Sequence, residues 1–178
     1  MALARHPRPD AIAPHLALTS TQIAALPEHA PGGVLAPSIA NAAPIDLSTP
    51  TRLAPGIVAV AAPGHSAGTI LIYARTTARE YLFVGDIAWL IGSVEQARGR
   101  PRLIRAFVPG VDPDRPAVLR QLRALHDIAA TEPDLVIVPA HDDAHLRELL
   151  ENGALTEGFV TAAAETALPS GESPPSSP

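Results

Sequence analysis

The chain has 178 residues, of which 47% are hydrophobic, so it is long enough for one domain with a core and short for two. Its 13 Lys and Arg against 18 Asp and Glu give a net charge of -5, which argues against the basic face that nucleic-acid binding requires. Because the chain has no cysteine, disulfides, thiolate nucleophiles and thiolate zinc sites are excluded. Any metal must therefore be held by His, Asp or Glu.

No stretch of the sequence suggests secretion or a membrane span. The first residues, MALARHPRPDAIAPH, lack the continuous apolar core of a signal peptide. No run approaches the roughly 18 consecutive apolar residues of a transmembrane helix. We therefore expect a cytoplasmic protein whose partners include neither a membrane nor a nucleic acid.

The two ends of the chain are predicted to be irregular. Residues 1–52 are rich in proline and offer only one short helical candidate, Ser20–Leu26. Residues 161–178 are expected to form a disordered tail, because LPSGESPPSSP at its end has almost nothing to bury. The structured part is thus predicted to be a single unit over residues 53–160.

Short apolar runs rich in β-branched residues predict three strands in the middle of the chain, over Gly56–Ala62, Thr69–Ala74 and Glu80–Asp86. The polar stretch RTTAR separates the last two runs, as in a hairpin. These segments indicate antiparallel pairing.

The following segments predict a helix, a strand and a second helix. Pro116–Thr131 carries apolar residues at helical spacing, and Asp114 is available to cap its start. The apolar run within Asp134–Asp142 predicts a buried strand. Asp142–Gly153 begins with two acids and ends in Asn-Gly, as a short helix does. The fold class is therefore α/β.

This order of elements brings three possible metal ligands to one edge of the sheet. In an antiparallel hairpin the start of the first strand lies beside the end of the second, which places His65 near Asp86. If the strand that ends before His141 runs parallel to the one that ends before Asp86, His141 joins the same edge. Two imidazoles and a carboxylate suit zinc, and also iron or manganese.

Each of these residues also has a purely structural interpretation. His65 follows Pro-Gly and is typical of a polar turn. Asp86 follows a glycine and suits a turn or the cap of a helix that starts at Ile87. His141 is a polar residue at a strand end. The convergence of all three favours a site.

The motifs PGHSAGT, FVGD and VPAHD, in this order and spacing, resemble the second half of the metallo-β-lactamase fold superfamily, in its glyoxalase II-like branch, over about Leu53–Leu150. The resemblance implies half of an αββα sandwich. It further implies that His65 binds a first metal, that Asp86 bridges two metals at the catalytic centre, and that His141 binds the second. Such hydrolases use a metal-held hydroxide to attack a carbonyl or phosphoryl centre.

The defining HxHxDH motif of that superfamily is missing from this chain. The upstream histidines His6, His15 and His29 are not spaced as a ligand pair, and we expect them to be exposed loop residues. A truncated enzyme, a pseudoenzyme, or ligands from another chain would each account for the difference. We therefore expect incomplete metal occupancy.

The remaining arginine, aromatic and histidine candidates have structural interpretations as well as functional ones. The arginines of the segment after Asp86 form either a solvated face or a clamp for an anionic substrate. Trp89 either walls a pocket or packs in the core. His126 and Asp127 fit the polar face of a helix, and an i,i+4 metal pair of His141 with His145 is doubtful. The arginines in question are Arg98, Arg100, Arg102 and Arg105.

The predicted function is that of a metal-dependent hydrolase acting on an ester, thioester or similar bond of a small molecule, truncated or degenerate. The alternative is a non-catalytic scaffold or interaction module. A third possibility is a mononuclear site formed by two histidines and one carboxylate. Because half a sandwich leaves a sheet face uncovered, we expect a homodimer or a partner chain on that face.

Overall fold

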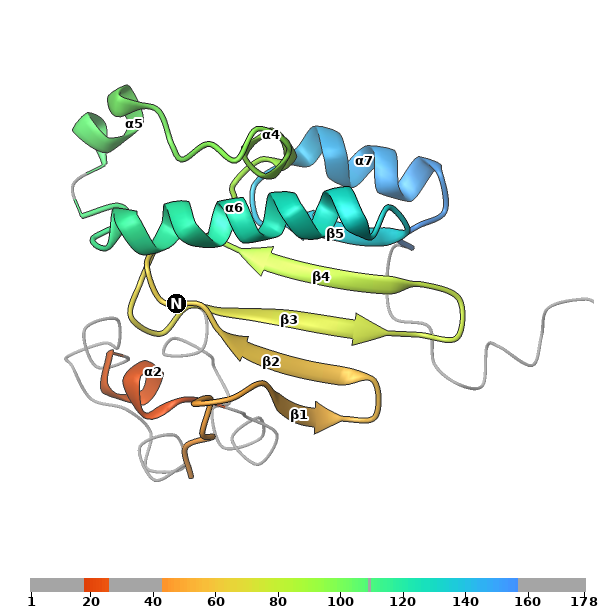
Figure 1. Cartoon of the computed structure of the whole chain (residues 1–178), viewed down its shortest axis with the longest axis horizontal. Coiled ribbons are helices and arrows are strands. Elements are labelled where there is room, and N and C mark those ends of the chain that lie inside the picture. The colour runs from red at the N-terminus through yellow and green to blue at the C-terminus, as the bar shows by residue number, and fades with distance from the viewer. Residues whose placement is uncertain (1–17, 26–42, 109, 157–178) are drawn as a thin grey trace, which may run out of the picture.

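The computed structural model describes residues 18–25, 43–108 and 110–156. They form a mixed α/β fold around one sheet with the strand order β1-β2-β3-β4-β5 (Figure 1). The pairings from β1 to β4 are antiparallel, and β5 runs parallel to β4. The elements are α2 (Ser20–Ala25), β1 (Thr51–Ala54), β2 (Ile57–Ala61), β3 (Ile70–Arg75), β4 (Glu80–Gly85), α4 (Ile91–Glu95), α5 (Arg102–Phe107), α6 (Arg115–Thr131), β5 (Leu135–Pro139) and α7 (Asp143–Glu151).

The predicted strands and helices are confirmed with small shifts at their ends. The β3–β4 hairpin and the parallel crossover through α6 to β5 have the expected connectivity. Asp114 caps α6, since its carboxylate accepts a hydrogen bond from the Ala117 backbone N–H at 3.0 Å. Strand β1, which begins within the segment expected to be irregular, and the short helices α4 and α5 were not predicted. The predicted tail lies outside the described residues.

The main core lies between one face of the sheet and α6. Val118, Leu122 and Leu125 of α6 are all at most 2% exposed, and their spacing puts them on one side of the helix. They pack in one cluster with Leu82 and Val84 of β4. The amphipathic pattern of α6 thus fixes the helix over β4, and with it the ends of the strands that carry the site.

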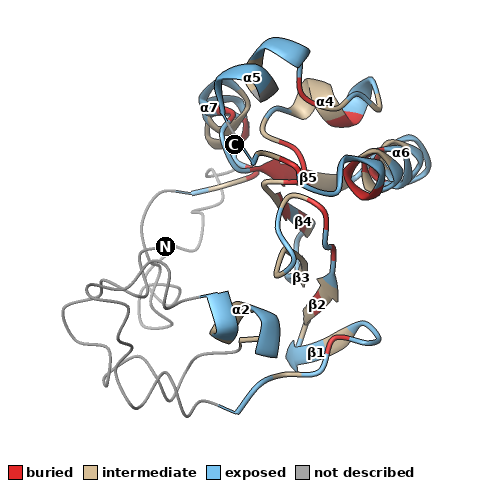
Figure 2. Cartoon of the chain, turned by 90° about the vertical axis from the view of Figure 1, so that its left-hand side faces the viewer, coloured by how far each residue is buried: buried red, intermediate tan, exposed pale blue. Residues whose placement is uncertain are grey.

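Strand β5 is covered on both faces. Ile137 belongs to the main core, whereas Val138, its neighbour, packs with Leu149 of α7 and Ala154 in a second cluster. Alternate side chains of a strand point to opposite faces, so α6 and α7 lie on opposite sides of β5, as Figure 2 shows. This explains why β5 is apolar at every position.

The remaining face of β3 and β4 is apolar and only partly covered by the described residues. Ile72 pairs with Phe83, and both point away from the main core because their neighbours Leu71 and Leu82 pack into it. Phe83 is 39% exposed and stacks against Tyr81, with the ring centroids 6.2 Å apart.

Within residues 18–25, 43–108 and 110–156, no helix is long and apolar enough to cross a membrane.

A glycine brings the histidine turn against the start of α6. Gly64 has φ of 151°, and a Cβ there would lie 3.0 Å from the Val118 Cγ2 atom and 3.1 Å from the Val118 backbone nitrogen. Only glycine fits this close approach without displacement of its neighbour. The Pro-Gly-His sequence therefore holds the next residue, His65, at a defined place over the helix.

Candidate functional site

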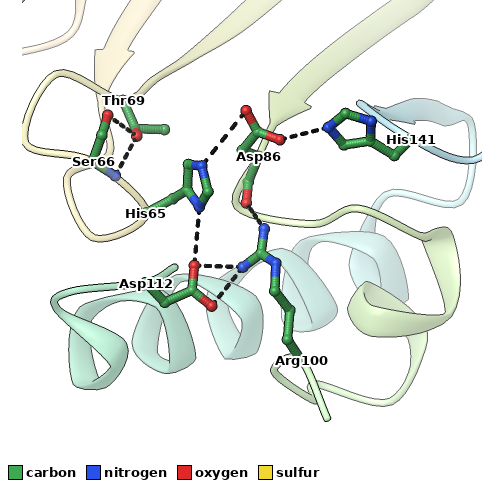
Figure 3. Close-up of polar contacts among 7 residues, drawn as sticks. All are labelled: His65, Ser66, Thr69, Asp86, Arg100, Asp112 and His141. Carbon is green, nitrogen blue, oxygen red and sulfur yellow. Dashed lines mark hydrogen bonds and ion pairs between the residues drawn. The ribbon is translucent and has the colours of Figure 1, made fainter. Parts of the chain in front are cut away.

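The structure brings the three predicted site residues together. His65 lies in the turn between β2 and β3, Asp86 directly follows β4, and His141 follows β5 (Figure 3). The His141 Nε2 atom lies 2.9 Å from one Asp86 carboxylate oxygen, and the His65 Nε2 atom lies 3.7 Å from the other. The central carboxylate therefore stands between two imidazoles contributed by segments far apart in the sequence.

Asp86 does not cap a helix. No helix starts at Ile87, and α4 begins at Ile91. The carboxylate that accepts a hydrogen bond from the Ile91 backbone N–H, at 2.8 Å, belongs to Asp142. The capping interpretation of Asp86 is therefore wrong, and its side chain is free to face the two histidines.

Asp142 joins the ends of β5, α4 and α7. Its buried carboxylate also accepts a hydrogen bond from the His145 backbone N–H at 3.1 Å and so caps α7. Burial acts to raise the pKa of Asp142, but the N–H groups of Ile91 and His145 outweigh it and hold the pKa below its ordinary value of 3.8. A charged Asp142 thus anchors the segment that presents His141.

A buried ion pair, not predicted from the sequence, lies behind His65. The Asp112 side chain is 2% exposed, and one of its oxygens lies 3.1 Å from the His65 Nδ1 atom. The Arg100 guanidinium, 5% exposed, donates from Nη1 to both oxygens of Asp112, at 2.6 Å to Oδ2. Arg100 Nη2 also donates to the backbone carbonyl of Asp86. Both expectations for Arg100, a solvated face and a substrate clamp, are therefore wrong.

Trp89 contacts the site from the other side. Its ring meets the His141 ring edge to face at 5.4 Å, and the Arg100 guanidinium lies 4.3 Å from the centre of the indole. The indole Nε1 atom is buried and has no hydrogen-bond partner among the described residues. Trp89 packs between Arg100 and His141 and thus forms part of the wall beside the imidazole.

The other candidates lie away from these residues. His145 directs its Nε2 atom to the Ile137 carbonyl at 3.0 Å and not to Asp86, which agrees with the doubt about a pair with His141. His126 contacts the Val94 carbonyl at 3.2 Å. Arg98 and Arg102 are exposed, as a solvated face requires. The three upstream histidines, His6, His15 and His29, lie outside the described residues.

The types of residue at the site suit a metal ion, but their side chains are not arranged around a common point. Two imidazole nitrogens and a carboxylate are donors that zinc, manganese and iron accept. In the part of the chain that the structure describes, however, no group of three or more His, Asp or Glu side chains is arranged to hold a metal ion. The Asp86 oxygens are directed at the imidazoles of His65 and His141 themselves.

Comparison with solved structures identifies proteins of the same fold. An N-acyl homoserine lactone hydrolase with N-hexanoyl-L-homoserine bound at its catalytic metal centre aligns with a TM-score of 0.51 at 18% identity, over 74% of this chain and 48% of that chain. A variant of AiiA from B. thuringiensis, with N-decanoyl-L-homoserine at its active site, gives the same values. A quorum-quenching N-acyl homoserine lactone lactonase aligns with a TM-score of 0.50 at 18% identity, over 74% of this chain and 50% of that one.

These alignments define the fold and its extent. No curated protein and no family model matches the sequence. The chain spans about half the length of the solved hydrolases that it matches. The resemblance inferred from PGHSAGT, FVGD and VPAHD is confirmed at the level of the fold: the chain has about half of a metallo-β-lactamase fold.

Proposed function

We propose that this chain carries half of the active site of a metal-dependent hydrolase, with His65, Asp86 and His141 as metal ligands. The observation that supports the proposal most directly is the contact of each imidazole with a different oxygen of Asp86, at 3.7 Å and 2.9 Å. The three residues follow β2, β4 and β5, at the sheet edge where open α/β sheets place their ligands.

In this proposal each residue has a defined task. A bound divalent metal supplies Lewis acidity and a more acidic water. His65, Asp86 and His141 would hold the ion. Asp86, with a side chain 40% exposed, and His141, 59% exposed, lie where a small molecule can reach them. Trp89 shields one side of the His141 ring from water.

The substrate class follows from the same chemistry. The solved proteins of this fold are described as hydrolases of N-acyl homoserine lactones, which are cyclic esters. We propose an ester, thioester or similar bond of a small molecule as the substrate, hydrolysed in the cytoplasm. The metal is zinc, manganese or iron, held with incomplete occupancy, because the sequence lacks the HxHxDH motif.

A second candidate function is that of a scaffold without catalysis. It is favoured because, among the described residues, no three possible metal ligands are arranged to hold an ion. We further propose that the apolar face around Ile72 and Phe83, which the described residues cover only in part, is covered by a second copy or by a partner chain. Light scattering at low micromolar concentration tests this: Phe83→Lys should yield monomers, whereas Leu103→Lys, at an exposed position of α5, should not. A compact wild-type monomer that binds no hydrophobic dye would contradict the proposal that a second copy or a partner chain covers this face.

Metal analysis combined with an ester assay tests the hydrolase proposal. Protein purified without added metal should contain less than one ion per chain, and added zinc or manganese should raise the hydrolysis of N-hexanoyl homoserine lactone or p-nitrophenyl acetate. Asp86→Asn should abolish the increase, while Asp127→Asn, an equal charge change at an exposed position of α6, should preserve it. Metal uptake without hydrolysis would favour the scaffold, and no uptake would contradict the metal site.

A further inference from the structure

Arg100 is a buried cation that contacts the surroundings of all three proposed ligands. It pairs with Asp112, which contacts His65; it donates to the backbone carbonyl of Asp86; and it stacks on Trp89, which packs against His141. A surface arginine that happens to form one ion pair would not meet three separate segments. The arrangement indicates a residue whose task is to hold the site together.

Its environment excludes a role in binding an anionic substrate directly. The Arg100 side chain is 5% exposed, and both of its terminal nitrogens already donate hydrogen bonds within the chain. The Nη1 atom of Arg100 donates to both carboxylate oxygens of Asp112, and this ion pair neutralises the charge of the guanidinium. The remaining donor atom of the guanidinium, Nε, is buried and has no hydrogen-bond partner among the described residues. The guanidinium therefore acts on the ligands and not on a substrate.

The connection that carries Arg100 and Asp112 has an unusual backbone at both ends. Ala97 has φ of 48° and Asp112 has φ of 54°, in the left-handed region that side chains other than glycine rarely adopt. Between them, Gly99 allows the chain to approach α6, since a Cβ there would lie 3.0 Å from the Leu119 Cδ2 atom. Such conformations persist only where the surrounding contacts enforce them. Here they bring Asp112 under His65.

The contacts of His65 define which nitrogen carries its proton. A carboxylate only accepts hydrogen bonds, so the contact of 3.1 Å between Asp112 and the Nδ1 atom requires a proton on Nδ1. The distance of 3.7 Å from Nε2 to Asp86 is too long for a hydrogen bond. Asp112 thus selects the tautomer in which the Nε2 lone pair is directed toward Asp86, as a metal ligand requires.

We propose that Arg100 and Asp112 are positioning residues of the site: Arg100 orients Asp112, and Asp112 fixes the ring and the tautomer of His65. The significance of this for metal binding rests on the proposed function, whereas the effect on the His65 tautomer does not. Because partners of metal-bound histidines commonly change metal affinity by about 10- to 100-fold, the same range is expected here.

Two measurements on the same variants test the proposal. Nitrogen-15 NMR of the metal-free protein should show His65 with its proton on Nδ1, and Asp112→Gly, which suits the positive φ, should shift it toward the Nε2–H form. Zinc titration followed by the emission of Trp89, the single tryptophan of the chain, should show affinity reduced about 10- to 100-fold in Asp112→Gly and Arg100→Lys. Asp112→Asn keeps an acceptor for the Nδ1 proton of His65. Compared with Asp112→Gly, it should therefore restore part of the Nδ1–H tautomer and part of the zinc affinity.

The controls separate positioning from folding and from the metal proposal. Arg98→Lys, at an exposed position two residues away, should match the wild type in both measurements. Circular dichroism in chelator shows whether each variant is folded. If Arg100→Lys does not fold, the result for Asp112→Asn decides whether the proposal holds. A wild-type protein that does not bind zinc would contradict the proposed function. The tautomer measurement would still show whether Asp112 positions the His65 ring. An unchanged His65 tautomer in Asp112→Gly, or a wild type protonated on Nε2, would overturn the inference.

Discussion

The two histidines that face Asp86 are held in very different ways. His65 rests on Asp112 and Arg100, whose side chains are almost completely buried, and a glycine turn presses it against α6. His141 is the most exposed of the three residues, and its ring makes one hydrogen bond, to Asp86, and one edge contact, to Trp89. The side chain of His65 is therefore fixed by buried contacts, whereas the side chain of His141 is largely exposed and makes few contacts.

The difference extends to the protons of the two rings. The contact of His65 Nδ1 with Asp112 favours a proton on Nδ1, which leaves Nε2 without one. His141 contacts the Asp86 carboxylate through Nε2 at 2.9 Å, so in this arrangement that nitrogen must donate. If both rings held a metal through Nε2, as proposed, the hydrogen bond between His141 and Asp86 would have to break, whereas no hydrogen bond of His65 Nε2 would be lost. Four predictions test this contrast.

The largest expected effect is on stability, at the buried side. Arg100→Met leaves Asp112 as an uncompensated buried charge and should lower the free energy of unfolding by about 3 to 5 kcal/mol. Arg98→Met, at an exposed position of the same segment, should change it by less than about 0.5 kcal/mol. Urea denaturation in chelator measures both. Equal stability of the two variants would show that the buried ion pair of Arg100 and Asp112 does not stabilise the fold.

A comparison of the two histidines should give the next largest effect. His65→Ala removes a hydrogen bond to a buried carboxylate and should lower the metal-free stability by about 1.5 to 3 kcal/mol. His141→Ala removes an exposed ring and should cost less than about 0.5 kcal/mol. Thermal and urea unfolding in chelator apply to both. If His141→Ala proved as costly as His65→Ala, the two sides would be equally ordered.

A pH-dependent effect is expected at the anchor of the His141 segment. Removal of Asp142 in Asp142→Ala should cost about 1 kcal/mol at pH 7, since its carboxylate caps α7 and accepts from the Ile91 N–H. The folded-state pKa of Asp142 lies below the unfolded one, so its contribution is fully present above the unfolded value of 3.8 and is lost as the pH falls through the folded value.

Unfolding of Asp142→Ala and of Asp143→Ala, an exposed neighbour, from pH 7 to pH 2 checks this point. The difference between wild type and Asp142→Ala should stay constant down to about pH 4 and then shrink. A difference that grew on acidification would show that the pKa of Asp142 is shifted in the opposite direction.

The smallest effect is expected where the two sides meet, at Trp89. Trp89→Phe weakens the contact with the Arg100 guanidinium but also removes an indole N–H that has no partner among the described residues. These changes oppose each other, so the stability should move by less than about 1 kcal/mol. A loss of several kcal/mol by urea denaturation would indicate that the indole N–H makes a hydrogen bond in solution.

Much of the exposed side was predictable from the sequence. The apolar runs, the hairpin loop and the capped α6 place β3, β4 and β5 in order, and strand connectivity alone then brings His65, Asp86 and His141 to one edge. The same pattern leads to the fold resemblance that the solved structures confirm. The three residues follow from topology because each lies directly beyond a regular element.

The buried side was not predictable in the same way. Arg100 and Asp112 lie in a connection without periodicity, and an arginine among exposed arginines has no local feature that indicates burial. The interpretation of Asp86 as the cap of a helix starting at Ile87 was wrong because α4 begins only at Ile91, whose N–H donates to Asp142, 51 positions away in the sequence. The one available signal was the polar loop GVDPD, which favours a turn but does not identify its partner.

Calorimetric titration of the wild type and Asp86→Asn with zinc tests the central claim most directly. The substitution keeps the size of the side chain and removes the charge that offsets the cation, so zinc affinity should fall by at least about 10-fold. The metal-free melting temperature should stay the same or rise slightly, because the carboxylate gains little beside two imidazoles. Equal zinc affinity in the two proteins would contradict the claim that Asp86 is a metal ligand of this site.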